Sequence, residues 1–161
     1  MSFEQAAAFV LRHEGGLVDD PADPGGLTAY GISQRAYPGL DIRGLTREAA
    51  IAIYRADYWD PLRCDELPGP VALLVFDGSV NQGAPTAARL LQRALGVKVD
   101  GVLGPPTMAA LSAWSPEALA TEVAAQRGLA YAKNPPARLD RFGLGWMRRL
   151  MACHRAALGH A

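Results

Sequence analysis

The chain has 161 residues, 50% of them hydrophobic, which is enough for one substantial core and suits a single domain with or without a small subdomain. Its 16 basic and 16 acidic residues balance, yet residues 1–80 hold 6 Lys/Arg against 12 Asp/Glu, whereas residues 81–161 hold 10 against 4. Two distant cysteines, Cys64 and Cys153, exclude a disulfide framework, and the longest apolar run, VALLVF at 71–76, is too short to span a bilayer.

The opposite charges of the two halves have two interpretations. The basic half can bind an anionic polymer such as cell wall, nucleic acid or a membrane surface, or the halves simply attract each other in the folded monomer. The N-terminal segment MSFEQAAAFVLRHEGG lacks the basic region of a secretory signal. We therefore expect synthesis in the cytoplasm without a signal peptide, no stable membrane insertion, and two reduced cysteines unless one long-range disulfide forms.

An amphipathic helix is predicted near the N-terminus. Ser2 and Gln5 have the spacing of a capping box, and Gly15-Gly16 ends the helix. Apolar residues recur at helical spacing up to Glu14, so this carboxylate shares the side of the helix that faces the core. Residues 17–33 then contain two Asp-Pro steps and a Gly-Gly pair, which favour turns, and LTAYGIS has the alternation of a short strand or hairpin arm.

The rest of the chain is predicted to be helical. The segment VALLVFDGSVNQG is apolar almost all round, and its length favours a buried central helix over a buried strand. The predicted helices are 46–58, 71–83, 84–95, 105–114, 115–133 and a last helix that ends near residue 159. The last helix is expected to present one apolar side, made of Leu139, Phe142, Trp146, Leu150, Met151 and His154. This is a mainly α pattern with one small irregular or β-containing lobe.

The stretch HEGGLVDDPADPGGLTAYGIS, residues 13–33, has the residue types needed for acid catalysis. A carboxylic acid that donates a proton near neutral pH needs a raised pKa, and Glu14 at the end of an apolar stripe is placed for that. Asp23 on the following segment is a candidate for a second, solvated carboxylate, with Asp19 and Asp20 as alternatives. Two carboxylates in different environments are what glycoside hydrolysis uses.

These same residues also have structural interpretations. Glu14 can be a helix-end acid held by an arginine or by backbone amides, and Asp23 can form an Asx-turn before Pro24. Thr28 can satisfy backbone groups at a strand edge. The EF-hand spacing is absent, so we expect no calcium, and no metal or cofactor is expected.

Residues 14–33 resemble the N-acetylmuramidases of glycoside hydrolase family 108, whose usual pattern is like EGGYVNDPxDxGGxTxxGIT. The sequence departs from that pattern at Leu17, where an aromatic residue is usual, and at Ser33, where threonine is usual. Further along, residues 76–111, with LQRALG, DG and GPPT, and residues 141–150, RFGLGWMRRL, resemble the C-terminal peptidoglycan-binding region of the same family. Together these stretches cover most of the chain in the family's order.

The resemblance implies a lysozyme-like α+β fold: a helical bundle around a buried central helix, with residues 1–83 as the catalytic part and 84–161 as the peptidoglycan-binding part packed on it. It also implies cleavage of the β-1,4 bond between N-acetylmuramic acid and N-acetylglucosamine. Glu14 would be the general acid, Asp23 the second carboxylate, and Thr28 would orient water or that carboxylate. A non-catalytic wall-binding or secretion-regulating protein and a lytic transglycosylase are the alternatives.

The implied partner is bacterial peptidoglycan, bound by a monomer, with no nucleic acid. Asp20, Tyr30, Asp77, Asn81 and Gln82 are the candidate substrate-binding residues, the last three because polar groups follow the buried apolar run at roughly one-turn spacing. Those three can instead cap helix ends. Further aromatic candidates for the groove are Tyr54, Tyr58 and Trp59, although the helical positions of Trp59, Trp114 and Trp146 are more typical of core residues. The arginines of the C-terminal half are expected on a solvated face or against an anionic wall: Arg138, Arg141, Arg148, Arg149 and Arg155.

Overall fold

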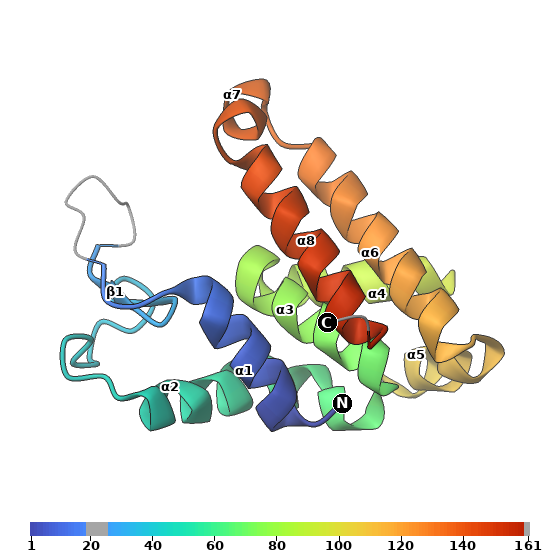
Figure 1. The fold of residues 1–161 in the computed structure, drawn as a ribbon. Helices are drawn as coiled ribbons and strands as arrows, with labels where there is room; N and C mark the ends of the chain where they lie inside the picture. Colours follow the sequence, from blue (N-terminus) through green and yellow to red (C-terminus); the bar gives the residue numbers. More distant parts are fainter. Residues whose placement is uncertain (19–25, 160–161) are drawn as a thin grey trace.

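The computed structural model describes residues 1–18 and 26–159, and in that part of the chain it confirms the mainly α fold class (Figure 1). The described sheet is a single antiparallel pair of short strands. In chain order the elements are α1 (Phe3–Glu14), β1 (Thr28–Ala29), β2 (Ile32–Ser33), α2 (Arg47–Tyr54), η1 (Arg55–Trp59), η2 (Asp60–Leu62), η3 (Cys64–Glu66), α3 (Gly69–Gln82), α4 (Ala84–Leu95), α5 (Pro105–Ala110), η4 (Leu111–Ala113), α6 (Pro116–Ala132), α7 (Pro136–Arg138), η5 (Leu139–Gly143) and α8 (Leu144–Ala157).

Helix starts are fixed by side chains that lie next to them in sequence. The hydroxyls of Ser2, Thr46 and Ser115 each accept a hydrogen bond from the backbone N–H three residues further on. In α1 the backbone N–H of Ser2 also donates to Oε1 of Gln5 over 2.9 Å, which completes the capping box. The predicted start of α1 is therefore confirmed, and its end at Gly15 is confirmed as well.

Two predicted helices contain breaks. The helix from Thr46 passes after Tyr54 into the wider π-helical turn η1 and then into η2. The predicted last helix is divided into α7, the π-helical turn η5 and α8. A π-helical turn inserts an extra residue and shifts the phase of an apolar stripe. The prediction of one continuous apolar side is therefore wrong, since Phe142 and Met151 are 42% and 49% exposed while Cys153 is buried.

The core is built around α3. All residues from Val71 to Ser79 are buried, which explains why this segment is apolar almost all round. Helices α1, α4, α6 and α8 all contact α3 and surround it on different sides (Figure 1). The predicted buried central helix is confirmed.

A hairpin follows the turn-rich segment. Ala29 pairs with Ile32, and Tyr30 and Gly31 form the two-residue loop with φ of 52° and 77°. Positive φ at both positions is the signature of a type I′ turn, whose twist matches that of paired strands. Thr28 also pairs with Val18, so the chain just beyond α1 lies against the hairpin.

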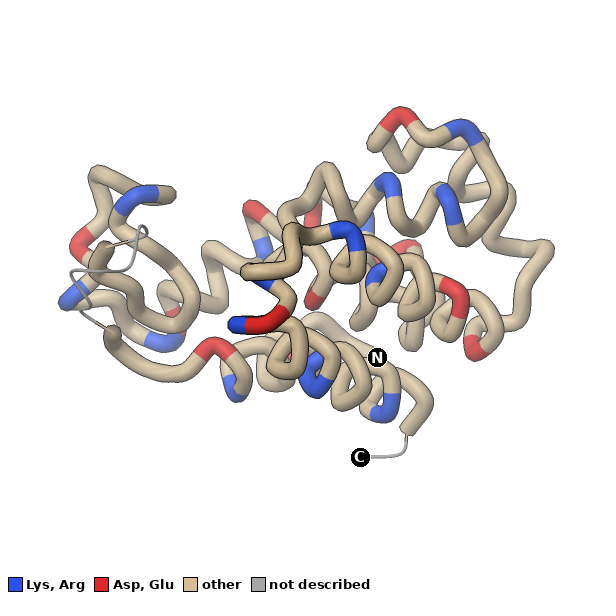
Figure 2. The backbone as a smooth tube through the Cα atoms, turned by 90° about the horizontal axis from the view of Figure 1, so that it is seen from above, with Lys and Arg blue, Asp and Glu red and all other residues tan. Residues whose placement is uncertain are grey.

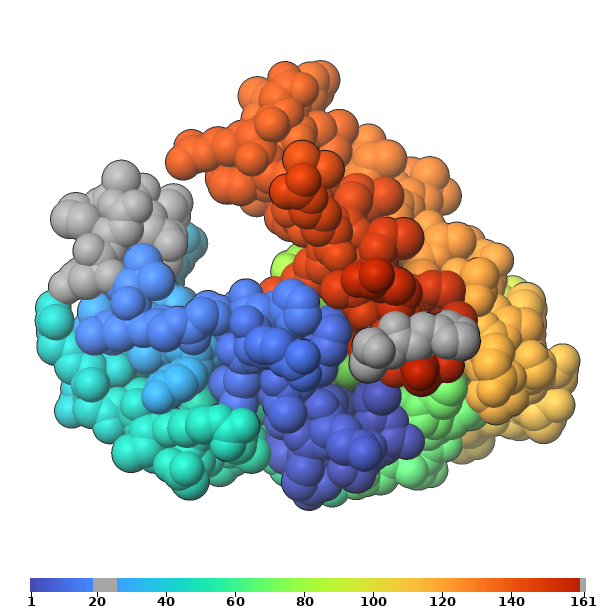
Figure 3. Space-filling view, in the orientation of Figure 1, coloured from blue at the N-terminus to red at the C-terminus, as the bar shows by residue number. Residues whose placement is uncertain are grey.

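The hairpin and α2 form a lobe on one side of α1, and α6 to α8 rise on the other side (Figure 1). Figure 3 shows a hollow between this lobe and the α7–α8 end of the molecule. Lys and Arg positions are spread along the whole backbone in Figure 2 rather than gathered at one end. None of the described helices is long and apolar enough to cross a membrane. Cys64 and Cys153 are both buried free thiols.

Candidate active site

Glu14 is the last residue of α1, and its side chain lies between the hairpin turn and Arg149 of α8. Its side chain is only 18% exposed. Oε1 of Glu14 accepts a hydrogen bond of 2.5 Å from Nη1 of Arg149, a residue of α8 that is 135 positions away in the sequence. The C-terminal helix therefore supplies a charged group directly to the carboxylate that the sequence singles out.

The hairpin presses against the same carboxylate. A Cβ placed on Gly31 would lie 2.6 Å from Oε2 of Glu14 and 2.8 Å from the hydroxyl of Tyr54. Only glycine fits here, because of this close approach and because of its positive φ. The hydroxyl of Tyr54 donates a 2.6 Å hydrogen bond to the backbone carbonyl of Tyr30, which fixes the turn in this position.

Tyr54 remains a neutral donor at this site. Burial, and after it the negative charge of Glu14, raise the pKa of Tyr54. The environment of Glu14 is thus made of an arginine, a neutral phenol and a glycine turn. One oxygen of the carboxylate faces α8 and the other faces the hairpin.

A buried ion network holds Arg149. Asp77, in the middle of α3, accepts from Nε of Arg149 over 2.9 Å and from Nη2 of Arg127 over 2.7 Å. Asp77 has no exposed area, and Arg127 is 1% exposed. Burial opposes ionisation of Asp77, yet the charges of Arg127 and Arg149 outweigh it and hold its pKa below the ordinary value. This network links α3, α6 and α8 to the end of α1.

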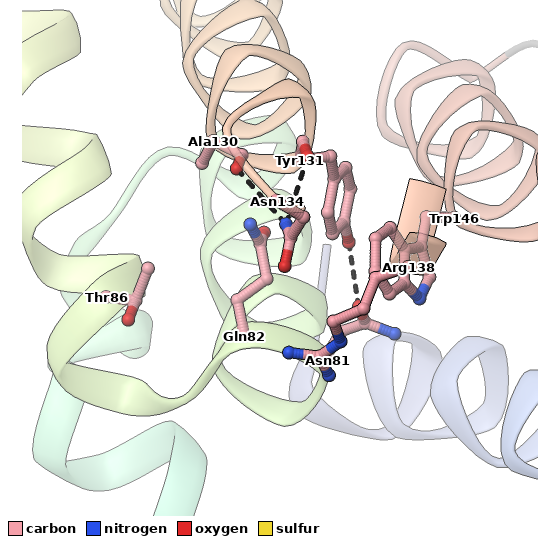
Figure 4. Close-up of a pocket in the computed structure, with 8 residues that line it drawn as sticks. All are labelled: Asn81, Gln82, Thr86, Ala130, Tyr131, Asn134, Arg138 and Trp146. Carbon is pink, nitrogen blue, oxygen red and sulfur yellow. Dashed lines mark hydrogen bonds between the residues drawn. The ribbon is translucent and has the colours of Figure 1, made fainter. Parts of the chain in front are cut away.

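A cleft runs past this network. One pocket of about 480 Å³ is lined by side chains of α1, α3 and α8, among them His13 and Arg149. A second pocket of about 450 Å³ lies between α3, α6 and the α7–α8 region, and Figure 4 shows the residues that line it. The two pockets share Asn81 and Trp146 in their linings, so they are neighbours, and the first of them also borders on Arg149, the partner of Glu14.

The predicted site residues lie in different parts of the structure, and some lie outside the described part of the chain. Asp20 and Asp23, and with them Asp19, lie outside the described residues. Thr28 is half-buried in β1, where its hydroxyl donates to the carbonyl of Gly26 over 3.1 Å, and Tyr30 is half-buried in the turn. Glu14 is brought together with the hairpin, as the motif indicates. Asn81 and Gln82 line the second pocket, of about 450 Å³.

Two other candidates, Asp77 and Trp59, do not line the groove. Asp77 is fully enclosed, so it does not contact a polymer in this structure and instead positions Arg149. Trp59 is buried and donates to Asp65 over 2.9 Å, so it does not line the groove. Asp77 is enclosed because it lies in the buried middle of α3, and Trp59 is enclosed because its ring packs edge-on against Phe3 and Phe76, with 5.3 Å between the ring centroids in both pairs.

Sequence reasoning missed the role of Arg149 and placed Trp146 in the core, although it lines the cleft. The sequence does contain a signal for a buried arginine partner. An aspartate inside an otherwise apolar buried helix needs a cationic partner, because an unpaired buried charge is strongly unfavourable. Asp77 therefore predicts a buried arginine, but nothing in its neighbourhood in sequence says which. Among the described residues, no group of three His, Cys, Asp or Glu side chains could hold a metal ion.

Comparisons with known proteins define the class of protein to which the chain belongs. Residues 7–83 match the family described as Glycosyl hydrolase 108, and residues 86–151 match the one described as Predicted Peptidoglycan domain. The chain belongs to the glycosyl hydrolase 108 family, which confirms the resemblance seen in residues 14–33. It is a member of a family of glycoside hydrolases that act on peptidoglycan.

A solved structure, titled "Structure of Brucella abortus SagA", is similar over nearly the whole chain. It has 33% sequence identity and a TM-score of 0.87, and the match covers 98% of this chain and 94% of that chain. No curated protein sequence matches the chain. The division of the chain after residue 83 stays a prediction.

Proposed function

We propose that the protein is a muramidase that hydrolyses the β-1,4 bond between N-acetylmuramic acid and N-acetylglucosamine, with Glu14 as general acid. The observation that carries this proposal is the placement of Glu14. It is a largely buried carboxylate held from two sides, by the glycine turn and by Arg149, and Arg149 itself lines a pocket. The family of the chain supplies the class of bond.

In this mechanism Glu14 protonates the glycosidic oxygen while the bond from that oxygen to the sugar's anomeric carbon breaks. Because Oε1 accepts from Arg149, we assign the proton to Oε2, the oxygen on the side of the hairpin. The positive charge that develops on the sugar ring is met by a second carboxylate or by an activated water. Asp23 is our candidate for that carboxylate, with Asp19 and Asp20 as alternatives, and Thr28 is our candidate for orienting the water.

One observation favours a second function. An ion pair with Arg149 is also what a purely structural acid at a helix end would form. In that case the protein would bind the wall without cutting it. The two functions predict different results for Glu14→Gln, which removes the charge and the acidity of the side chain but keeps its shape: a muramidase loses cleavage, whereas a wall-binding protein has no cleavage to lose.

The test is digestion of purified peptidoglycan by the wild-type protein and by Glu14→Gln, with mass spectrometry of the released fragments. We expect reducing N-acetylmuramic acid ends from the wild type and a rate lower by about 10²- to 10⁴-fold in the variant, the usual contribution of a general acid. Glu48→Gln is the matched control, since Glu48 is an exposed glutamate in the first turn of α2. It should cut at the wild-type rate.

The other outcomes are equally informative. Anhydro ends would make the enzyme a lytic transglycosylase with the same acid. Equal cleavage by Glu14→Gln and wild type would remove Glu14 from the chemistry. Wall binding without cleavage by the wild type would establish the non-catalytic function.

A further inference from the structure

The second pocket, between α3, α6 and the α7–α8 region, is built from amides, an arginine and aromatic rings. Its lining residues are Asn81, Gln82, Thr86, Ala130, Tyr131, Asn134, Arg138 and Trp146 (Figure 4). These residues come from distant parts of the sequence, and the pocket holds about 450 Å³.

The buried Arg127 acts on two side-chain amides of this pocket, Asn81 and Gln82, whereas a third amide, Asn134, donates from Nδ2 to the backbone carbonyls of Ala130 and Tyr131 and keeps its oxygen as an acceptor. Nε of Arg127 donates to Oε1 of Gln82 over 3.1 Å. Arg127 also donates to the hydroxyl of Tyr131, which in turn donates to Oδ1 of Asn81 over 2.8 Å. An arginine can only donate, so Gln82 must present its oxygen to Arg127, and Asn81 presents Oδ1 to the hydroxyl of Tyr131, which donates to it. Their NH₂ groups remain as donors, with no acceptor among residues 1–18 and 26–159.

A positive charge completes the donor set. Arg138 lines the pocket and is exposed, and within the described part of the chain no carboxylate forms a salt bridge with it. Its guanidinium lies 6.0 Å from the ring centroid of Trp146, at cation–π distance. Trp146 is stacked with Tyr131 at 5.3 Å between centroids and with Phe142 at 5.9 Å. The wall beside the arginine is thus an ordered row of rings.

The pocket lies close to the proposed cleavage site. It shares Asn81 and Trp146 with the depression beside Arg149. Asn81 is one helical turn beyond Asp77, which corresponds to about 6 Å along the axis of α3. A group bound here can therefore belong to the same polymer strand that Glu14 acts on.

From these contacts we propose that the pocket binds a carboxylate on the lactyl–peptide substituent of the polymer, with Arg138 as the charge partner and the NH₂ groups of Asn81 and Gln82 as hydrogen-bond donors. The inference rests on the proposed function, since it takes peptidoglycan as the substrate. It adds a basis for selectivity: a polymer of N-acetylglucosamine alone has the same backbone linkage but no carboxylate. The carboxylate has two sources, the free lactyl group of a glycan without stems or the acidic residues of a stem peptide.

The test measures binding and uses the full chain carrying Glu14→Gln, so that ligands stay intact. Calorimetry would give dissociation constants for three soluble probes: a chitotetraose, a stem-free peptidoglycan tetrasaccharide, and the same tetrasaccharide with stem peptides. We expect the carboxylate-bearing probes to bind at least about tenfold more tightly than chitotetraose, as one charge-assisted hydrogen bond provides. Adding Arg138→Gln should abolish that preference and leave the affinity for chitotetraose within about twofold.

Arg141→Gln is the matched control, because Arg141 has the same charge but lies over Phe142 at 4.9 Å and does not line the pocket. It should keep the preference. Loss of preference for only one of the two carboxylate probes in Arg138→Gln would identify the lactyl group or the stem as the source. An unchanged preference in Arg138→Gln, or an equal loss in Arg141→Gln, would overturn the proposal. Failure of the wild type to cleave walls is a separate result that concerns the proposed function.

Discussion

Replacing Gly31 by alanine should displace the carboxylate of Glu14 although Glu14 itself is not substituted. The new Cβ would lie 2.6 Å from Oε2 of Glu14, whereas ordinary contact begins at 3.4 Å, so the carboxylate must move by about 0.8 Å. The new Cβ would also lie 2.8 Å from the hydroxyl of Tyr54, which is held by its hydrogen bond to the carbonyl of Tyr30. A misplacement of about 1 Å at a reacting group costs on the order of 100-fold in rate.

Gly31→Ala should also lower the stability of the folded protein, for a separate reason. The φ of Gly31 is 77°, a conformation that costs an alanine about 1–2 kcal/mol. Gly96 provides the matched control, since its φ is 69° and nothing lies within 4 Å of the site of a new Cβ. Gly96→Ala should show the backbone cost alone, a decrease of about 2–4 °C in Tm for each kcal/mol in a protein of this size.

The assay combines thermal unfolding with the rate of release of soluble fragments from peptidoglycan. We expect Gly31→Ala to lose about 100-fold in cleavage rate and Gly96→Ala to keep the wild-type rate. Gly31→Ala with full activity would refute the close packing of the hairpin on Glu14. Equal losses of activity in both variants would show that the effect comes from stability and not from the position of the acid.

Two further predictions concern the core. The pKa of Asp77 is lowered in the folded chain, so its ion pairs stabilise the fold above the unfolded pKa of about 3.9 and this contribution is lost as the pH falls. Asp77→Asn should therefore lower the free energy of unfolding by about 3–5 kcal/mol at pH 7 and by about 1 kcal/mol less at pH 3, since each pH unit below the unfolded pKa removes at most about 1.4 kcal/mol; urea titration measures both, and an equal difference at the two pH values would contradict the assignment. Burial raises the pKa of the Cys64 thiol to about 12 and also raises that of Cys153, so a thiol reagent at pH 8 should label neither in the native protein and both after unfolding. Rapid labelling of the native protein would show that these thiols are accessible.

Part of the candidate site could be read from the sequence because its determinants are local. The end of α1 at Gly15 places Glu14, and the alternation in LTAYGIS predicts a short strand or hairpin arm, although the turn at Tyr30 and Gly31 could not be predicted because tyrosine rarely adopts a positive φ. Asp77 shows the limit of such reading. Its place after an apolar run suggested a polar group at the groove, whereas the structure encloses it between Arg127 and Arg149.

The amino-acid sequence by itself determined the helix starts at Ser2, Thr46 and Ser115, the central position of α3 and the acid at the end of α1. Each of these depends on hydrogen bonds or periodicity within a few residues, so the neighbours in sequence are also the neighbours in space.

Only the tertiary structure decided which residues meet that acid. Arg149 reaches Glu14 across 135 positions, and the pocket of Arg138 brings together residues of α3, α4, α6 and α8. Helix faces show which residues are buried, but several packings can bury the same faces. The choice among them follows from side-chain interdigitation and from the need to pair every buried charge, and both are properties of the assembled chain.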